Sequence, residues 1–316
     1  MDFQTAKQYD NEYIIHSYGR FPVLLTKGKG ATVQDDTGKT YIDFTSGIGV
    51  NALGFCDDNW VQAVSAQLQT LQHTSNLYYT EPCIQAAKLL CEKSGMKKVF
   101  FGNSGAEANE GVIKAARKYS FLKYGASRNK IIALQNSFHG RTMAALSATG
   151  QDAYHNFFFP FVDGFVFAKA NDFADILSKM TDDVCAVMLE TVQGEGGVVP
   201  LDKEYVQAVA KACKEKDILL IVDEVQTGMG RTGSLFSYQQ FGIQPDLVSC
   251  AKGLGGGLPI GAVLFGEKTE TVFVPGDHGS TFGGNPVVCA GAVHILNTMD
   301  DAFLPVSYTH LRAHET

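Results

Sequence analysis

The chain has 316 residues, of which 45% are hydrophobic and 19% are charged, a composition typical of a globular protein with one large or two medium domains. The net charge of −7 is spread along the chain, without the basic stripe of a nucleic-acid-binding protein. The seven cysteines form no CxxC pair, so we expect no disulfide framework, no metal site and a reducing, cytoplasmic location. Because no apolar run approaches the roughly 20 residues of a membrane span, we expect no membrane partner either.

The first 50 residues differ in pattern from the rest of the chain. Two turn signals, at residues 28–30 and 35–38, separate short β-like pieces such as Thr40–Phe44. We therefore expect residues 1–50 to form a small N-terminal lobe.

From about residue 99 onward, short apolar runs alternate with segments of helical period, a pattern typical of βαβ units. The expected strands are Val99–Phe101, Lys130–Leu134, Cys185–Glu190, Ile218–Glu224, Leu247–Ala251 and Ala262–Phe265. We expect residues 51–299 to form a large α/β domain, in which helices flank a mostly parallel central sheet.

Residues 305–316 show neither helical nor strand period. They are either a frayed C-terminus or sequence foreign to the native protein, and we favour the second interpretation. The predicted domains thus end with a short, non-native tail over residues 300–316.

Three motifs follow expected strands. The small residues Gly102–Ala106 open a helix, where free backbone N–H groups can hold a phosphate, although such a turn alone is more often just a cap. Asp223 and Glu224 end an apolar run and face either a ligand crevice or a surface turn. Lys252 ends another run and precedes four glycines within five residues, a position that is usually solvated surface but here leaves room for a planar ligand.

Together the three motifs supply the fixed points of a pyridoxal 5'-phosphate site. Lys252 would carry the cofactor as a Schiff base, Asp223 would hold the ring nitrogen protonated, and the helix N-terminus would hold the phosphate. Two other motifs are discounted. The GxGxxG stretch at residues 228–233 is not followed by an amphipathic helix, and Gly38–Thr40 lacks the first glycine of a P-loop.

Six blocks, in order along residues 10–299, carry a family resemblance. They are Asn103–Glu110, Phe138–Thr142, Gln193–Gly197, Val222–Gly228, Ala251–Gly257 and Ser280–Pro286. In these blocks the chain resembles the class III pyridoxal-phosphate-dependent aminotransferases, which implies the fold of the type I pyridoxal-phosphate transferases.

The resemblance implies a role for each site residue. The implied catalytic residues are Lys252 and Asp223. The implied cofactor-binding residues are Ser104, Gly105, Ala106, Phe138, Asp223, Glu224, Val225, Gln226, Lys252 and Thr281. Phe138 would stack on the ring, and Thr281 would reach the phosphate in the neighbouring subunit of a homodimer. The implied substrate-binding residues are Arg141, which would clamp a carboxylate, with Ser280 and Glu195.

The resemblance further implies transamination of N2-acetylornithine with 2-oxoglutarate, giving N-acetylglutamate 5-semialdehyde and glutamate in arginine biosynthesis. Ornithine, succinylornithine or 4-aminobutyrate could replace that donor. The chain could also be a silent cofactor-binding fragment, or a lysine-dependent lyase or decarboxylase. Family members continue past the helix near His294 and supply a second carboxylate-binding arginine, a role we do not assign to Arg312. We therefore expect an incomplete C-terminal small domain.

Overall fold

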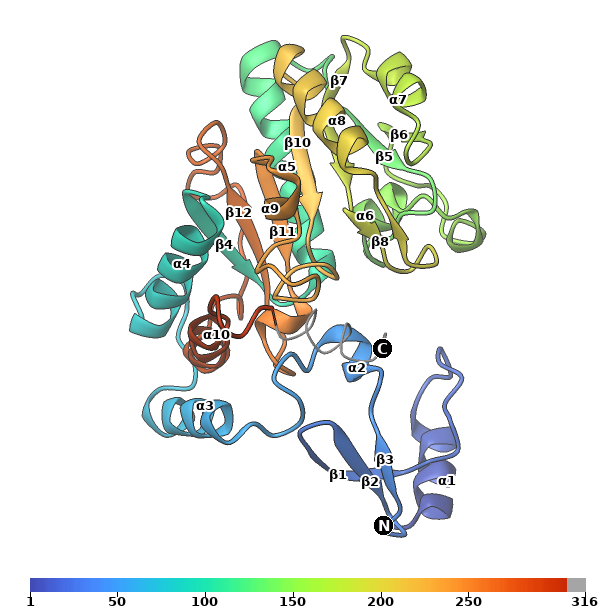
Figure 1. Ribbon diagram of the computed structural model, residues 1–316, viewed down its shortest axis with the longest axis vertical. Helices are drawn as coiled ribbons and strands as arrows, with labels where there is room; N and C mark the ends of the chain where they lie inside the picture. The colour runs from blue at the N-terminus through green and yellow to red at the C-terminus, as the bar shows by residue number, and fades with distance from the viewer. Residues whose placement is uncertain (306–316) are drawn as a thin grey trace.

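The structure is a computed structural model, and it describes residues 1–305. It consists of a large α/β part and a small N-terminal part at the opposite end of the molecule (Figure 1). The tail prediction falls mainly on residues 306–316, outside the described residues, while residues 301–305 form turns. None of the helices in the described part combines the length and the apolar character that a membrane crossing requires.

A seven-stranded sheet forms the centre of the large part, in the order β4-β12-β11-β10-β7-β5-β6. The bounds are β4 (Lys98–Gly102), β5 (Lys130–Leu134), β6 (Phe165–Ala168), β7 (Val184–Leu189), β10 (Leu219–Asp223), β11 (Leu247–Cys250) and β12 (Gly261–Phe265). Only β12 runs against its neighbours, so the carboxyl ends of the other six strands meet at one edge of the sheet.

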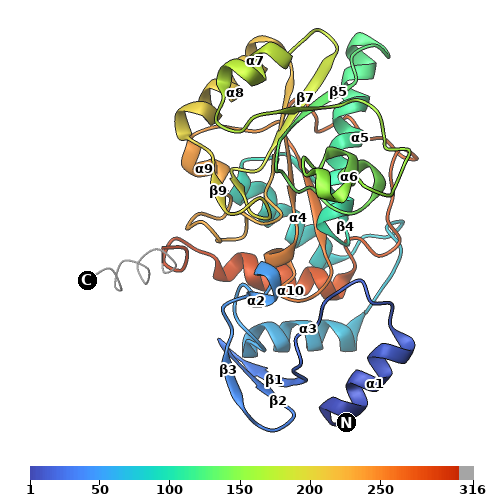
Figure 2. The ribbon, with the colours of Figure 1, turned by 90° about the vertical axis from the view of Figure 1, so that its right-hand side faces the viewer.

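Helices cover both faces of this sheet, because neighbouring strand residues such as Ile131 and Ile132 point to opposite sides. The helices are α3 (Asp58–Thr70), α4 (Glu81–Ser94), α5 (Gly105–Tyr124), α6 (Met143–Ala148), α7 (Phe173–Lys179), α8 (Lys203–Glu215), α9 (Tyr238–Phe241) and α10 (Pro286–Thr298). Helices α5 and α6 pack on one face, and α4, α7, α8 and α10 on the other. Figure 2 shows α3 lying alongside α10 at the foot of the large part.

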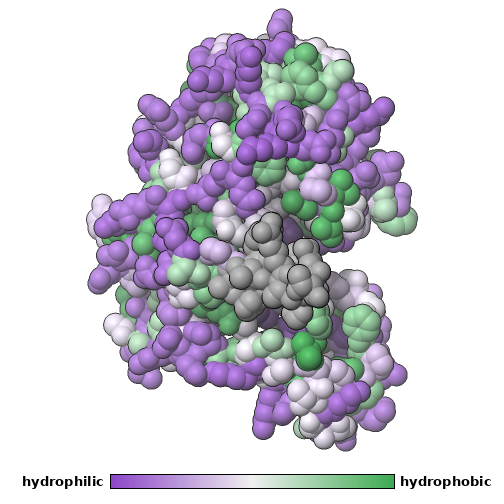
Figure 3. All heavy atoms as spheres, in the orientation of Figure 1, coloured by the Kyte–Doolittle hydropathy of each residue, from purple (hydrophilic) through white to green (hydrophobic). Residues whose placement is uncertain are grey.

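The small part is a three-stranded antiparallel sheet with two helices. Its elements are α1 (Phe3–Tyr13), β1 (Leu25–Lys29), β2 (Thr32–Asp35), β3 (Thr40–Ile42) and α2 (Ser46–Gly49). Within residues 1–50 only Val33 and Asp35 are buried, so this sheet has almost no core of its own. Figure 3 shows the outline of the molecule indented on one side between this part and the large part.

The structure confirms the predicted α/β fold with a mostly parallel sheet flanked by helices. All six expected strands form, with ends shifted by at most one residue. One strand of the large sheet, β6, was not predicted; it is a four-residue edge strand whose signal is weak in an aromatic-rich segment. Residues 228–233 form turns with no helix directly after them, as expected for a false GxGxxG match. The predicted domain boundaries stay predictions.

Candidate active site

A cavity of about 610 Å³ lies at the carboxyl edge of the large sheet. Ten of the predicted site residues line it: Ser104, Gly105, Ala106, Phe138, Arg141, Glu195, Asp223, Val225, Gln226 and Lys252. They come from segments far apart in the sequence, and parallel strands bring them together because their carboxyl ends share one edge. Tyr18 and Val50 add a wall from the N-terminal part.

The N-terminus of α5 forms one side of the cavity. Ser104, the N-cap, accepts through Oγ a hydrogen bond from Glu107 N at 3.2 Å, and Glu107 Oε2 accepts one from Asn103 N at 2.6 Å, so two hydrogen bonds fix the start of the helix. The first N–H groups, at Gly105 and Ala106, have no partner within the helix and lie at the positive end of its dipole. This helix end is therefore suited to bind an anion such as a phosphate.

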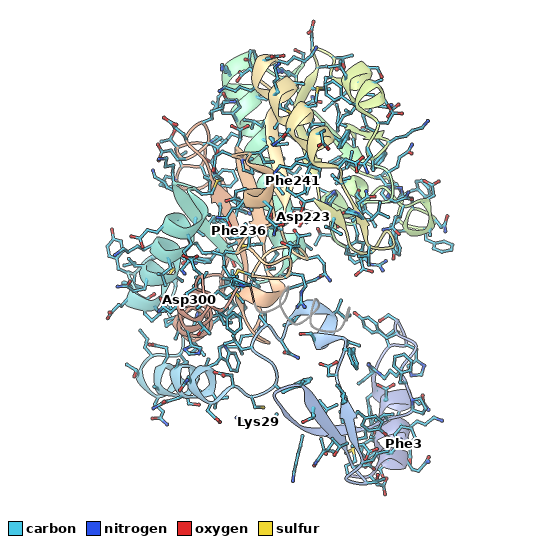
Figure 4. The ribbon with its side chains drawn as sticks, in the orientation of Figure 1. Phe3, Lys29, Asp223, Phe236, Phe241 and Asp300 are labelled. Atoms are coloured by element: carbon cyan, nitrogen blue, oxygen red, sulfur yellow. The ribbon has the colours of Figure 1, made fainter. Side chains whose placement is uncertain are left out.

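Asp223 lies where β10 ends, near the middle of the molecule (Figure 4). Its side chain is 3% exposed. Oδ1 accepts from Val225 N at 2.9 Å, while Oδ2 accepts from Asn109 Nδ2 at 2.7 Å and lies 2.7 Å from His139 Nδ1. A carboxylate has about four acceptor positions, so about one remains available toward the cavity that Asp223 lines.

Three residues around Asp223 were missed by the sequence reasoning: Asn109, His139 and Glu190. All three line the cavity. Burial opposes a charge on His139, but the hydrogen bond and charge of Asp223 and the charge of Glu190 outweigh burial and raise the pKa of His139. Burial raises the pKa of Glu190, whose Oε2 accepts from Phe138 N at 3.0 Å. The signal for Glu190 was available, because Glu190 follows strand β7 as Asp223 ends β10.

Lys252 follows β11 with a φ of 47°, a left-handed conformation that is costly for a residue with a side chain. Its Nζ donates to Gln226 Oε1. Burial lowers the pKa of Lys252 and outweighs the opposing effect of Asp223 and the other nearby carboxylates. The glycines after Lys252 have two roles. Gly255 lets the chain turn tightly, because a Cβ there would lie 2.0 Å from Leu258 O, and Gly257 leaves space where it lines the cavity.

Three predicted residues lie outside the cavity lining. Glu224 is a correction: its carboxylate points into the core and accepts from Thr227 Oγ1 at 2.6 Å and from Tyr238 N at 2.8 Å. The reason is strand geometry, since neighbouring residues at a strand end point to opposite faces. Ser280 Oγ instead accepts from Asn103 Nδ2 at 3.2 Å and from Gly283 N at 2.9 Å. Thr281 is exposed, and its predicted role in a second copy of the chain stays a prediction.

The cavity fits pyridoxal phosphate by its donor set and by its shape. It offers a primary amine at Lys252, the free amides of α5, a buried carboxylate at Asp223 and the ring of Phe138. The space next to the amides depends on residues without side chains: a Cβ on Gly105 would lie 2.6 Å from Val225 Cγ1, and one on Gly140 would lie 2.9 Å from Ala106 Cβ. The backbone there is thus packed closely around the anion-binding helix end.

Comparisons with known proteins place the chain in a family. The family described as Aminotransferase class-III matches residues 13–314. An acetylornithine aminotransferase of Haemophilus ducreyi is 56% identical over 305 residues, which cover 96% of this chain and 78% of that protein. One of Caldanaerobacter subterraneus is 52% identical, over 94% of this chain and 75% of that protein.

Solved structures agree with these relatives. An ornithine aminotransferase of Toxoplasma gondii superposes with a TM-score of 0.95 at 34% identity, covering 99% of this chain and 75% of that one. An N-acetylornithine aminotransferase of Stenotrophomonas maltophilia gives a TM-score of 0.81 at 36% identity, covering 97% and 75%. The chain therefore belongs to the class III aminotransferases and is a pyridoxal-phosphate-dependent enzyme of that family.

Proposed function

We propose that this aminotransferase transfers the terminal amine of N2-acetylornithine to 2-oxoglutarate, giving N-acetylglutamate 5-semialdehyde and glutamate, a step of arginine biosynthesis. Relatives named acetylornithine aminotransferase match more than nine-tenths of the chain at 45–56% identity. The observation that carries the proposal is the joint presence of Lys252, Asp223 and Arg141 in one cavity.

Lys252 is the residue that would hold the cofactor and move the proton. When bound, pyridoxal phosphate supplies a conjugated ring that takes up the electron pair left when a proton leaves the carbon next to the amine. Because burial lowers its pKa, Lys252 Nζ is a better base at neutral pH than an exposed lysine. Its bond to Gln226 Oε1 orients the amine within the cavity.

Asp223 supplies a fixed negative charge at the floor of the cavity. Asn109, His139 and Val225 N hold both of its oxygens in place, so no reorganisation is needed when positive charge is placed opposite them. We assign the free acceptor position of Asp223 to the protonated ring nitrogen, Phe138 to the ring face and the amides of Gly105 and Ala106 to the phosphate. Arg141 would bind a substrate carboxylate, and Glu195 lines the same cavity.

We also propose that the enzyme is a cytoplasmic homodimer with the active site at the interface. Large apolar side chains of the N-terminal part are strongly exposed in the single chain, with Phe44 at 92%, Ile15 at 87% and Phe21 at 87%. An apolar surface of this kind is typical of a subunit contact. The seven cysteines are all free, which fits a reducing compartment.

Ornithine is the second candidate donor. The high TM-score of 0.95 with the ornithine aminotransferase of Toxoplasma gondii favours it, although at only 34% identity. The two donors differ in the charge at the α-amine, so they can be separated by direct comparison.

The visible spectrum of the protein with pyridoxal phosphate tests the proposal. We expect the absorbance band of the bound cofactor to bleach on addition of N2-acetylornithine and to return with 2-oxoglutarate. The Lys252→Ala variant serves as the control and should show no such cycle. A band that responds to ornithine and ignores N2-acetylornithine would favour the second candidate, and a band that ignores both donors would overturn both.

A further inference from the structure

Two aromatic rings, and no acidic side chain, hold Arg141 in the cavity. The guanidinium carbon of Arg141 lies 4.0 Å from the centre of the Tyr154 ring and 5.5 Å from that of Phe138. The two rings meet edge to face, with centroids 5.8 Å apart and an interplanar angle of 72°. Among residues 1–305 the Arg141 side chain has no hydrogen bond or ion pair, so its charge and its N–H groups are left for a ligand.

We propose that Tyr154 is a positioning residue, which orients Arg141 for a substrate carboxylate; this inference rests on the proposed function. A guanidinium is planar, and all five of its N–H groups lie in that plane. A ring against its face leaves the N–H edge free. Since a carboxylate binds that edge bidentately, a guanidinium held by its face is already in the orientation that carboxylate binding requires.

The backbone around Tyr154 is itself fixed. Tyr154 ends the short 3-10 helix η1 (Asp152–Tyr154) and is partly buried. The next residue, His155, lies with Nε2 2.9 Å from Leu146 O in helix α6, directly after the segment that carries Arg141. No hydrogen bond of the Tyr154 hydroxyl is found within residues 1–305, so the ring, and not the hydroxyl, makes the contact with Arg141.

A second arginine–tyrosine stack shows the difference between a structural arginine and Arg141. Arg128 lies over the ring of Tyr124 at 4.2 Å, a geometry close to that of Arg141 and Tyr154. Arg128, however, donates to Val184 O, Lys216 O and Asp217 O, so its N–H groups are used within the protein. Arg141 is stacked on Tyr154 in a similar way, but its N–H groups have no partner within residues 1–305 and so can bind a ligand.

Tyr154 should strengthen carboxylate binding by holding Arg141 in its binding orientation before the ligand arrives. A long, exposed arginine side chain loses conformational freedom when it binds a carboxylate, and a ring that already fixes it removes part of that cost. A cation–π contact of this kind contributes between about twofold and thirtyfold in an equilibrium constant. Tyr154 touches Arg141 and acts through it, so the effect should appear in binding and not in the chemical step.

The test uses the enzyme loaded with pyridoxal phosphate. The ligand is glutarate, a dicarboxylate without an amine or an oxo group. Calorimetry gives the Kd of glutarate, and steady-state kinetics give KM and kcat for 2-oxoglutarate. We expect Tyr154→Leu to raise Kd and KM about tenfold with kcat within about twofold of the parent. Tyr154→Phe, which keeps the ring, should stay within about twofold of the parent in all three. Tyr124→Leu, the matched control at the structural stack, should leave the Kd unchanged.

Arg141→Leu separates the two proposals. If Arg141→Leu binds glutarate as well as the parent, the carboxylate role of Arg141 in the proposed function is wrong. If Arg141→Leu weakens binding and Tyr154→Leu does not, only the present inference is wrong. In the double variant, Tyr154→Leu should have no further effect, because its effect acts through Arg141. A further loss in the double variant, or equal losses in Tyr154→Leu and Tyr154→Phe, would also overturn the inference.

Discussion

Strands β5, β7 and β10 of the large α/β part, or large domain, are buried on both faces, whereas the sheet of the small N-terminal part, or lobe, buries only Val33 and Asp35. The two regions also differ in the pKa of a buried carboxyl group. Burial raises the pKa of Glu224 in the large domain to about 7. In the lobe, hydrogen bonds from Thr37 and Tyr41 lower the pKa of Asp35 to about 2.

This contrast shows which interactions fix the backbone in each region. In the large domain a deep core fixes the backbone, so polar groups at the strand ends are forced to sit where water cannot reach them. In the lobe, local hydrogen bonds within one hairpin fix the turn, as Asp35 Oδ1 accepts from Thr37 N, Thr37 Oγ1 and Lys39 N. Lys252 and Asp223, the proposed catalytic residues, belong to the large domain, where positions are set most firmly.

The largest expected effect is on Asp223, at the edge of the large sheet. Asp223→Asn removes the charge but keeps the shape of the side chain, and we expect kcat to fall by about a hundredfold or more, on the order of 3 kcal/mol. The far-UV circular dichroism should not change, since the strand remains buried. Rates within about threefold of the parent would show that the charge of Asp223 is not what the reaction uses.

The pH dependence of stability tests the contrast between the carboxylates. The raised pKa of Glu224 contributes stability that is fully present below its unfolded pKa of 4.5 and is lost as pH rises through about 7. Glu224→Gln keeps partners for Thr227 and Tyr238, so it should reduce the loss in the free energy of unfolding between pH 5 and pH 8 by about 2 kcal/mol, measured by denaturant titration at both pH values.

Asp35 should show the opposite sign. The lowered pKa of Asp35 contributes stability that is present above its unfolded pKa of 3.8 and is lost as pH falls through about 2. Asp35→Asn loses this contribution, so above about pH 4 its stability should lie below that of the parent by a constant amount, and the fall on the acid side should disappear. If the Glu224 and Asp35 variants show the same dependence of stability on pH, then the two carboxylates do not differ in the way that burial and local hydrogen bonding predict.

The smallest expected effect concerns packing. Ile132 in β5 is fully buried, while Ile42 in β3 is 67% exposed. Removing one methylene with Ile132→Val should lower the free energy of unfolding by about 1 kcal/mol, whereas Ile42→Val should change it by less than about 0.5 kcal/mol. Guanidinium titration of both variants measures the difference, and equal losses would mean that a partner covers the lobe as firmly as helices cover the large sheet.

The sequence predicted the features that depend on local pattern. The strands that carry Asp223 and Lys252 were found because strands buried on both faces read as continuous apolar runs. The start of helix α5 was found because the small residues Gly102–Ala106 follow an expected strand and precede a segment of helical period. Ten of the predicted site residues line the cavity, because parallel strands bring their carboxyl ends to one edge.

Only the tertiary structure decided which way each strand-end side chain points and which distant residues meet. Asp223 and Glu224 are neighbours in the sequence, yet one faces the cavity and the other the core. Asn109, His139 and Glu190 surround Asp223 from three separate segments, and Tyr154 reaches Arg141 from a fourth. No local pattern records such contacts, because they depend on how helices and strands pack in three dimensions and on which groups that packing removes from water.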